Sequence, residues 1–312
     1  MNIRSQIILF SSILSVMILT ADCMASVKNA DLSNPNKYSA IRDSINNLIS
    51  NTPGQIGVAV IIDNTDTISI NNDFRYPMMS VYKLHQALAV CNKLDRLNQS
   101  LDSLVTIERT TLNPDTWSPM LKEHPKDKFT LSVKDLLTYT LTLSDNNASN
   151  YLFDNILDTQ STYEFISTII PQSGFKIAYT EEEMYNDHDK AYANYTTPSS
   201  AASLINTLFT DSIISMEKQS FINTTLSKCL TGNDRIMAPL LNIEGIKIAH
   251  KTGSGYINHR GELVAHNDVA YISLPDGKHY SLAIFVKDFH GTEAAASNII
   301  ANISAIVYKF LE

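Results

Sequence analysis

Two strand-forming segments lie towards opposite ends of the chain, on either side of a long helical stretch. The segment "QIGVAVIIDNTDTISINN" (55–72) is rich in β-branched residues and is broken by "DNTD", which predicts a hairpin. Near the C-terminus, "GIKIAHKTGSG", "DVAYISL" and "HYSLAIFV" predict three more strands, and the turn "PDGK" joins the last two. Strands joined by tight turns pair antiparallel. We therefore expect one antiparallel sheet of five strands, completed by both ends of the chain.

The stretch between these segments is mostly helical in pattern, from Ser80 to about Phe221. Its amphipathic runs include "LHQALAVCNKLDRL", "LSVKDLLTYTLTL", "ASNYLFDNIL", "TYEFISTII" and "PSSAASLINTLF". The sequence thus predicts an α/β (α+β) architecture. An α/β lobe would comprise residues 36–72 and 226–312, with helices flanking the sheet, and an all-helical lobe would comprise residues 73–225. A cleft between the lobes is where a functional site is expected.

The composition excludes one class of partner. The chain has 312 residues, of which 44% are hydrophobic, so it has ample material for one large domain or two intertwined lobes. Its net charge is −8 and it has no block rich in Lys and Arg. Because phosphate binding needs concentrated positive charge, a nucleic-acid partner is not expected.

The N-terminus has the pattern of a secretory signal peptide. Arg4 precedes a short apolar run (7–20) and the small residues of "ADCMAS", which predicts a signal peptide over residues 1–25. We therefore expect an exported, periplasmic protein, a monomer with no stable membrane span after signal removal; an uncleaved anchor is the alternative. Cys23 would allow a lipid-anchored form, although Asp22 fits a lipid-attachment signal poorly. Cleavage after Ala25 leaves Cys91 and Cys229, whose pairing the sequence does not decide.

The stretch "YPMMSVYKLHQALAVCNKL" places Ser80 and Lys83 one helical turn apart at the start of a helix. A hydroxyl becomes a nucleophile only with a base beside it, and a lysine in a dry cleft near another cation can lose its proton. The free N–H groups of a helix N-terminus also favour developing negative charge. Alone, however, such a match more often marks an N-cap and a surface lysine, and "SMEK" (215–218) matches too.

Two further motifs support the catalytic interpretation. "TLSDNNASN" places Ser144, Asp145 and Asn146 between two helical runs, and "AHKTGSG" places Lys251-Thr252-Gly253 at the end of a strand. Ser-x-x-Lys, Ser-Asp-Asn and Lys-Thr-Gly, in this order, form the serine-acylation signature of β-lactamases and penicillin-binding proteins.

With these motifs the sequence resembles a class A serine β-lactamase over nearly all of the mature chain. "YPMMSVYK", "SDNNAS", "TEEEM" and "AHKTGSGY" resemble the extended cephalosporinase branch of that class. The resemblance implies a β-lactamase/transpeptidase-like fold and an acyl-enzyme hydrolase for small-molecule β-lactams, cephalosporins preferred, with no cofactor and no metal.

The resemblance also implies roles for individual residues. Ser80 would attack the lactam carbonyl, and Lys83 would take its proton directly or with a loop glutamate and a water. Ser144 would pass a proton to the lactam nitrogen, and the N–H groups of Ser80 and Ser254 would form the oxyanion hole. Asn146 would hold the substrate amide and help to position Lys83. The substrate carboxylate would be bound by the motif Lys251, Thr252 and Gly253 and by Ser254.

A loop near residues 176–197 would carry the glutamate that activates water against the acyl-enzyme. "TEEEM" offers Glu181, Glu182 and Glu183, and the family pattern favours Glu181 because Met184 fits the aliphatic position three residues later. A solvated acidic loop is the alternative. Tyr185 stands where the commonest pattern has an Asn that shares the hydrolytic water, so how this chain would hold that water is open.

Three other positions near the expected cleft remain open. Many class A enzymes have an Arg on the strand after Lys-Thr-Gly, but that register falls near Asn267 here. Arg260, in the enlarged loop "YINHRGELVAHND", would be a substitute, and this loop would suit bulkier cephalosporin side chains. Trp117 would lie either at the cleft entrance or in the core.

Other functions have weaker support. The eight His residues are scattered and form no His-x-His-x-Asp or His-Glu-x-x-His cluster, so a zinc-dependent lactamase is unsupported. His250 is expected to be a packed strand residue. A penicillin-binding D-alanyl-D-alanine carboxypeptidase would share the three motifs, but "TEEEM" favours a lactamase. A non-catalytic β-lactam sensor usually follows transmembrane helices, and none is evident after residue 20.

Overall fold

The computed structural model describes residues 35–312 of the chain. The predicted signal peptide, with Cys23, lies outside the described residues. The chain divides into two compact units between Asp43 and Ser44, within helix α2 (Pro35–Ile49). The second unit, Ser44–Glu312, contains all of the strands and all of the helices after α2.

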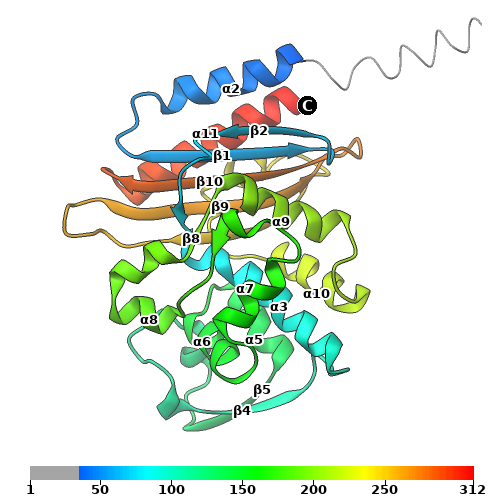
Figure 1. The fold of residues 1–312 in the computed structure, drawn as a ribbon, viewed down its shortest axis with the longest axis vertical. Helices are drawn as coiled ribbons and strands as arrows, with labels where there is room; N and C mark the ends of the chain where they lie inside the picture. Colours follow the sequence, from blue (N-terminus) through cyan, green and yellow to red (C-terminus); the bar gives the residue numbers. More distant parts are fainter. Residues whose placement is uncertain (1–34) are drawn as a thin grey trace, which may run out of the picture. The chain divides into compact units, whose positions relative to one another are not determined.

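A five-stranded antiparallel sheet confirms the expectation that both ends of the chain complete one sheet (Figure 1). The strands are ordered β2–β1–β10–β9–β8, and their bounds are β1 (Gln55–Ile62), β2 (Asp66–Ile70), β8 (Lys247–Ser254), β9 (Leu263–Ser273) and β10 (His279–Phe289). Strand β1 lies beside β10, with Gln55 opposite Lys287 and Ile62 opposite Tyr280. The predicted turns at residues 63–65 and 274–278 join β1 to β2 and β9 to β10.

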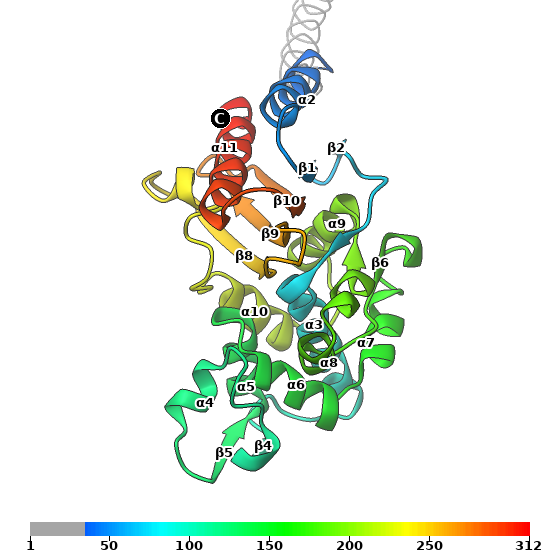
Figure 2. The ribbon, with the colours of Figure 1, turned by 90° about the vertical axis from the view of Figure 1, so that its left-hand side faces the viewer.

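Two helices cover the faces of this sheet. Helix α11 (Glu293–Leu311) packs against β9 and β10, and α9 (Pro198–Thr210) packs against β1, β9 and β10 from the other side (Figure 2). Because both faces are covered, β9 is buried along almost its whole length. Among the described helices, only α11 is long and apolar enough to cross a membrane, but its packing on the sheet is that of a core helix.

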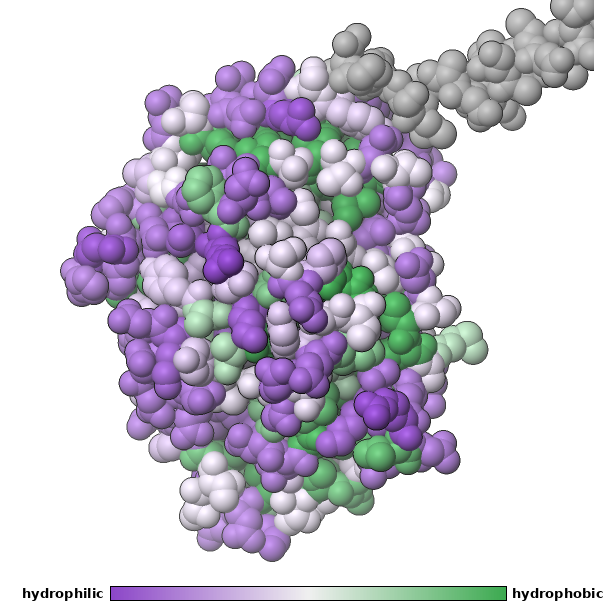
Figure 3. Space-filling model, viewed as in Figure 1, coloured by the Kyte–Doolittle hydropathy of each residue, from purple (hydrophilic) through white to green (hydrophobic). Residues whose placement is uncertain are grey.

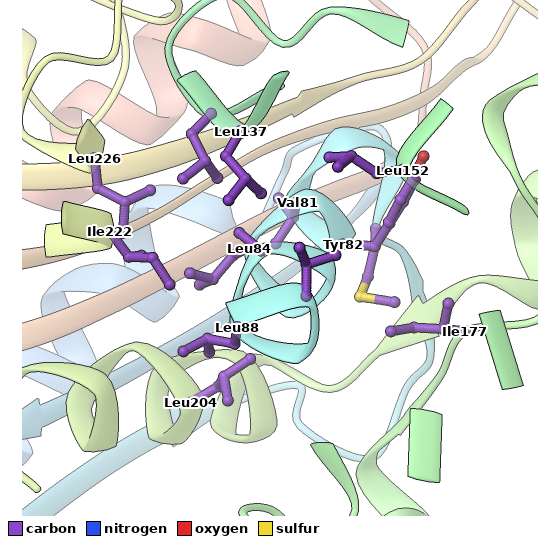
Figure 4. Packing of buried hydrophobic residues seen from close by; sticks show 14 of the residues in the cluster. Val81, Tyr82, Leu84, Leu88, Leu137, Leu152, Ile177, Leu204, Ile222 and Leu226 are labelled. Carbon is purple, nitrogen blue, oxygen red and sulfur yellow. The ribbon is translucent and has the colours of Figure 1, made fainter. Parts of the chain in front are cut away.

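Helix α3 (Tyr82–Arg96) is the centre of the helical part of the chain. It contacts α5 (Val133–Thr142), α6 (Asn146–Asn155), α7 (Thr159–Ile166) and α10 (Met216–Leu226). Figure 4 shows Leu84 and Leu88 of α3 among side chains of the surrounding elements, which include Leu137, Ile222 and Leu226. A helix enclosed on this many sides buries its polar residues too, and Lys83 is 0% exposed.

Two short sheets lie in the stretch predicted to be wholly helical. One pairs β4 (Leu104–Glu108) with β5 (Lys128–Ser132), and the other joins β3 (Tyr76–Pro77), β7 (Tyr195–Thr196) and β6 (Phe175–Lys176). The helix predicted from Leu131 starts instead at Val133. The reason is a capping box, in which Ser132 and Asp135 each accept the other's backbone N–H.

The surface of the helical part is mixed in character. Figure 3 shows mainly hydrophilic residues on this face, with hydrophobic ones scattered between them.

Cys91, on α3, and Cys229, just after α10, are both buried and free, so the pairing that the sequence left open is absent.

Strand β8 packs closely against the turn before α3, and Gly253 makes that contact. A Cβ on Gly253 would lie 2.3 Å from the carbonyl oxygen of Met78. Gly253→Ala should therefore push the Ser80 turn away from β8. We expect the free energy of unfolding to fall by about 1–3 kcal/mol, as in other overpacked sites, and kcat to fall with it. Urea unfolding and steady-state kinetics measure the two effects.

Gly277→Ala is the matched control. Gly277 has a φ of +90° in the β9–β10 turn, but no atom lies within 4 Å of an added Cβ. Its replacement should cost about 1–2 kcal/mol of backbone strain and leave kcat unchanged. Equal effects of the two variants on kcat would contradict the steric explanation.

Candidate active site

The three sequence motifs meet in one cleft between the sheet and the helical part. The cavity has a volume of about 640 Å³, within the usual range for small-molecule sites. Residues from each motif and from the predicted loop line it, namely Ser80, Ser144, Asn146, Glu181, Thr252 and Ser254. Segments more than 170 residues apart along the chain thus face one small volume.

Ser80 lies in a single 3₁₀ turn (Met79–Val81) that leads into α3. Met79 has a φ of +45°, an unfavourable backbone conformation for a residue with a Cβ. Such strain persists where the surroundings impose it, often at functional sites. The turn directs the Ser80 hydroxyl at the loop glutamate, and Ser80 Oγ donates a hydrogen bond to Glu181 Oε1 at 3.2 Å.

Lys83, one turn after Ser80, is fully buried and directs its ammonium group at three acceptors. Nζ donates to Ser144 O at 2.8 Å and to Asn146 Oδ1 at 2.6 Å, and lies 3.1 Å from Glu181 Oε1. Burial lowers the pKa of Lys83, while the charge of Glu181 opposes this shift. Ser80 and Lys83 therefore share one carboxylate oxygen, which places the Ser80 hydroxyl beside both the Glu181 carboxylate and the Lys83 side chain.

Ser144 lies between two lysines. Its backbone oxygen accepts from Lys83, and its Oγ accepts a hydrogen bond from Lys251 Nζ at 3.0 Å. Ser144 also has a positive φ of 58°. Burial lowers the pKa of Lys251 to about 8, and the charge of Lys83 acts in the same direction. The hydroxyl is thus held where it can relay a proton between the two sides of the cleft.

Asp145 fixes the loop that presents Ser144 and Asn146. Its fully buried carboxylate caps α6 by accepting from Ala148 N, and it also accepts from Met120 N and Ser118 Oγ. Asn146 donates from Nδ2 to Thr116 Oγ1, which fixes the amide with its oxygen towards Lys83. Thr116 was not identified from the sequence.

Of the three loop glutamates, only Glu181 directs its carboxylate into the cleft. The loop forms the short helix α8 (Glu181–Asn186), which Thr180 caps in a capping box with Glu183. That box turns the Glu183 carboxylate back to Thr180 N. Glu182 is exposed, and its backbone N–H donates to Asn150 Oδ1. Glu181, by contrast, is 9% exposed and contacts both Ser80 and Lys83.

The end of β8 supplies the other wall of the cleft. Gly255 N donates to Ala265 O of β9, so the N–H of the preceding Ser254 points away from β9 in this antiparallel ladder. Ser80 lies in the first turn of its helix, where backbone N–H groups have no carbonyl of a preceding turn to bind. These are the two N–H groups that the sequence suggested for an oxyanion hole.

Arg235 is the main residue of the site that the sequence analysis missed. It is 6% exposed, and it donates to Gly253 O at 3.2 Å, Asn267 O at 2.7 Å and Ser254 Oγ at 2.6 Å. Arg260, the substitute considered from the sequence, is instead exposed at the surface and paired with Glu262. The cation behind Ser254 therefore comes from the "GNDRIM" segment, before β8. Arg235 lies in a loop that matches no catalytic motif, so the sequence contained no signal for its role.

Aromatic residues form the rim of the cleft. Trp117 is 55% exposed and donates from Nε1 to Leu143 O, so it lies at the cleft and not in the core. Tyr185 also lines the cleft and is 45% exposed. On the opposite side, Tyr256 donates to His188 O at 2.9 Å, and its ring lies tilted against the His188 ring with the centroids 4.2 Å apart. These contacts connect the α8 loop to the loop after β8.

The remaining candidates of the sequence analysis have structural roles. Lys218, in the second Ser-x-x-Lys match, pairs with Asp95 at 2.8 Å, far along α3 from Ser80. His250 is buried in β8, as expected, and pairs with Asp268 of β9. Residues 35–312 contain no group of three or more His, Cys, Asp or Glu arranged to hold a metal ion.

Comparison with known proteins agrees with this geometry. The sequence matches the β-lactamase enzyme family over residues 40–311. It is 54% identical to a β-lactamase of Phocaeicola vulgatus over 99% of this chain and 97% of the relative. It is also 33% identical to β-lactamase VEB-1 of Pseudomonas aeruginosa, over 85% of this chain and 88% of that protein.

Solved structures show the same fold. The extended-spectrum β-lactamase TLA-3 aligns with a TM-score of 0.84 and 33% identity, over 88% of this chain and 99% of that one. A class A β-lactamase of Bacteroides cellulosilyticus aligns with a TM-score of 0.83 and 30% identity, over 88% and 98% of the two chains. The chain therefore belongs to the β-lactamase enzyme family, as a class A serine β-lactamase that hydrolyses β-lactams.

Proposed function

We propose that the enzyme prefers cephalosporins and works through an acyl-enzyme on Ser80 that Glu181 helps to hydrolyse. The observation that carries the mechanism is the position of Glu181 Oε1, within 3.2 Å of Ser80 Oγ and 3.1 Å of Lys83 Nζ. One carboxylate oxygen is in reach of both the nucleophile and its neighbouring amine.

In acylation, the Ser80 oxygen attacks the lactam carbonyl while its proton passes to the Lys83–Glu181 pair. Burial lowers the pKa of Lys83 and so favours loss of its proton, which an amine base requires, and Glu181 offers the alternative route through a water. The N–H groups of Ser80 and Ser254 stabilise the oxyanion, and each such donor is worth about 3–4 kcal/mol in the transition state. Ser144 protonates the lactam nitrogen and draws the replacement proton from Lys251, 3.0 Å away.

In deacylation, Glu181 activates the water that hydrolyses the ester. This step separates the proposal from a penicillin-binding carboxypeptidase, which would keep the three motifs and deacylate β-lactams slowly. The buried Glu181 carboxylate, which contacts Ser80 Oγ and Lys83 Nζ, supplies the base that a lasting acyl-enzyme lacks.

Substrate recognition combines a cationic wall, formed by Lys251 and Arg235, with an aromatic rim, formed by Trp117 and Tyr185. Lys251, Thr252 and Ser254 bind the substrate carboxylate, with Arg235 supporting Ser254 from behind. Asn146 holds the side-chain amide. The exposed rings of Trp117 and Tyr185 suit the larger side chains of cephalosporins.

We also propose that the enzyme is exported to the periplasm and acts as a monomer.

Glu181→Gln should trap the covalent intermediate. Without the carboxylate base, deacylation should slow by about 10²- to 10⁴-fold, the usual contribution of a general base. Intact mass spectrometry after exposure to a cephalosporin should then show a lasting adduct on Ser80.

Glu182→Gln is the control, because the Glu182 side chain is exposed and its backbone alone contacts Asn150. It should turn over cephalosporin normally and retain no adduct. Normal turnover by Glu181→Gln would remove Glu181 from its proposed role.

Lys251 should impose a limit at alkaline pH. Its pKa is lowered to about 8, so the ammonium is present below that pH and is lost as the pH rises through it. We therefore expect KM for cephalosporins to rise above about pH 8. Lys251→Arg, which stays charged, should abolish this rise. An unchanged profile in that variant would assign the titration to another group.

Arg235 and Arg260 allow a matched test of the cationic wall. Arg235→Gln should raise KM by about 10- to 100-fold, as expected for a lost hydrogen bond to a charged group, with a smaller change in kcat. Arg260→Gln should leave both constants unchanged because Arg260 pairs with Glu262 outside the cleft. The reverse ranking would restore Arg260 as the carboxylate-binding residue.

A further inference from the structure

A second group of reactive side chains lies buried behind the substrate-binding wall. Cys229, from the segment after α10, is 6% exposed; His250 of β8 and Asp268 of β9 are 1% and 0% exposed. The proposed mechanism uses none of the three. His250 directly precedes Lys251, and Asp268 lies opposite Thr252 in the sheet, so the group adjoins the site that holds the substrate.

The three side chains are arranged in series. His250 Nδ1 lies 3.0 Å from Asp268 Oδ1, which orients the ring. His250 Nε2 is buried and has no hydrogen-bond partner among the described residues. The charges of His250 and Cys229 act on each other, and each favours the charged form of the other. A carboxylate that orients an imidazole whose charge favours a nearby thiolate is the arrangement that activates cysteine nucleophiles.

The charges around Cys229 favour the thiolate. Burial alone would raise the pKa of the Cys229 thiol, but His250 and the positive charge of Lys251 lower it to about 7. Burial likewise opposes the charged form of His250, yet Asp268 raises the pKa of His250 to about 10. Cys91 is the contrast within the same chain, because its apolar surroundings raise its pKa to about 12. Only Cys229 of these two is therefore expected to be a thiolate near neutral pH.

A short path connects the sulfur to the cleft. Cys229 Sγ lies 3.4 Å from Thr231 Oγ1, and Thr231 Oγ1 lies 2.6 Å from Thr252 Oγ1. Both threonines line the cavity. One side chain therefore separates the thiol from the space that the substrate occupies. A small neutral oxidant, such as hydrogen peroxide, is of the size that can reach such a site.

We propose that Cys229 is a peroxide-reactive thiol and that its oxidation weakens substrate binding at Thr252. The thiolate attacks one oxygen of hydrogen peroxide, so that an S–O bond forms and the O–O bond breaks. The leaving hydroxide takes a proton from the His250 imidazolium and departs as water. The products are a sulfenic acid, one water and a neutral imidazole; sulfur loses two electrons and the peroxide gains them.

An oxygen added to Cys229 Sγ competes for space with Thr231, because Sγ already lies 3.4 Å from Thr231 Oγ1 and 3.7 Å from Thr231 O. It displaces the Thr231 hydroxyl, and the 2.6 Å contact that holds Thr252 is lost. Loss of one hydrogen bond to the charged substrate should raise KM by about 10-fold, with kcat less affected. This effect on KM rests on the proposed role of Thr252, whereas the oxidation of Cys229 does not.

The test treats the purified enzyme with hydrogen peroxide, removes the excess with catalase and measures two quantities. Peptide mass mapping after unfolding in dimedone, which traps sulfenic acids, should show Cys229 oxidised at least about 10-fold faster than Cys91, as its thiolate character predicts. Steady-state kinetics should show the rise in KM, and dithiothreitol should reverse it. Methionine sulfoxide is not reversed by this treatment.

Variants decide whether Cys229 carries the effect. Each variant is compared with its own untreated sample. Cys229→Ala should lose its sensitivity to peroxide, Cys91→Ala should remain as sensitive as the unmodified enzyme, and His250→Gln should slow the oxidation of Cys229. Equal oxidation rates of the two cysteines, or an undiminished response in Cys229→Ala, would overturn the proposal. Oxidation of Cys229 without a change in KM would refute the coupling to substrate binding and leave the hydrolytic mechanism intact.

Discussion

A single buried ammonium group, that of Lys83, organises the catalytic centre. A charge removed from water is costly unless acceptors surround it, and Lys83 has three, from Ser144, Asn146 and Glu181. None of these belongs to its own helix. The loop before α6 and the loop at α8 must both close over α3 to satisfy one cation. The same contacts place Ser80, Ser144 and Glu181, the proposed nucleophile, proton relay and deacylating base, within reach of one another. Stability and the proposed catalysis therefore depend on the same interactions.

A second set of cations faces the first across the cleft. Lys251 reaches Ser144 from β8, and Arg235 supports Ser254 from behind. Like charges this close lower each other's pKa, and the charge of Lys83 does so for Lys251. The cleft thus concentrates positive charge in a protein whose net charge is −8, which favours an anionic small molecule without attracting anions to the rest of the surface.

The sequence contained the information for the sheet and for the three motifs, because both rest on local patterns. Alternating β-branched residues specify strands, and Ser80, Ser144 and Lys251 stand within short strings of fixed spacing. Arg235 could not be found in this way, since it reaches Gly253, Ser254 and Asn267 only through tertiary contacts. The same limitation applies to Cys229 and His250, which are 21 residues apart and meet only because the segment after α10 packs against β8. The short pairing of β4 with β5 was missed because its strands are five residues each and lie within a mainly helical stretch.

The contact between Tyr256 and His188 joins two segments that both line the cleft. Tyr256 belongs to the loop after β8, which lines the cleft, and His188 follows the helix that begins with Glu181. A lineage that enlarges its cleft by replacing Tyr256 also loosens the segment that carries Glu181, the proposed water-activating carboxylate. Mutations that let the cleft accept bulkier antibiotics would then slow turnover. Adaptation to a new drug would require compensating changes on both sides of the contact between Tyr256 and His188.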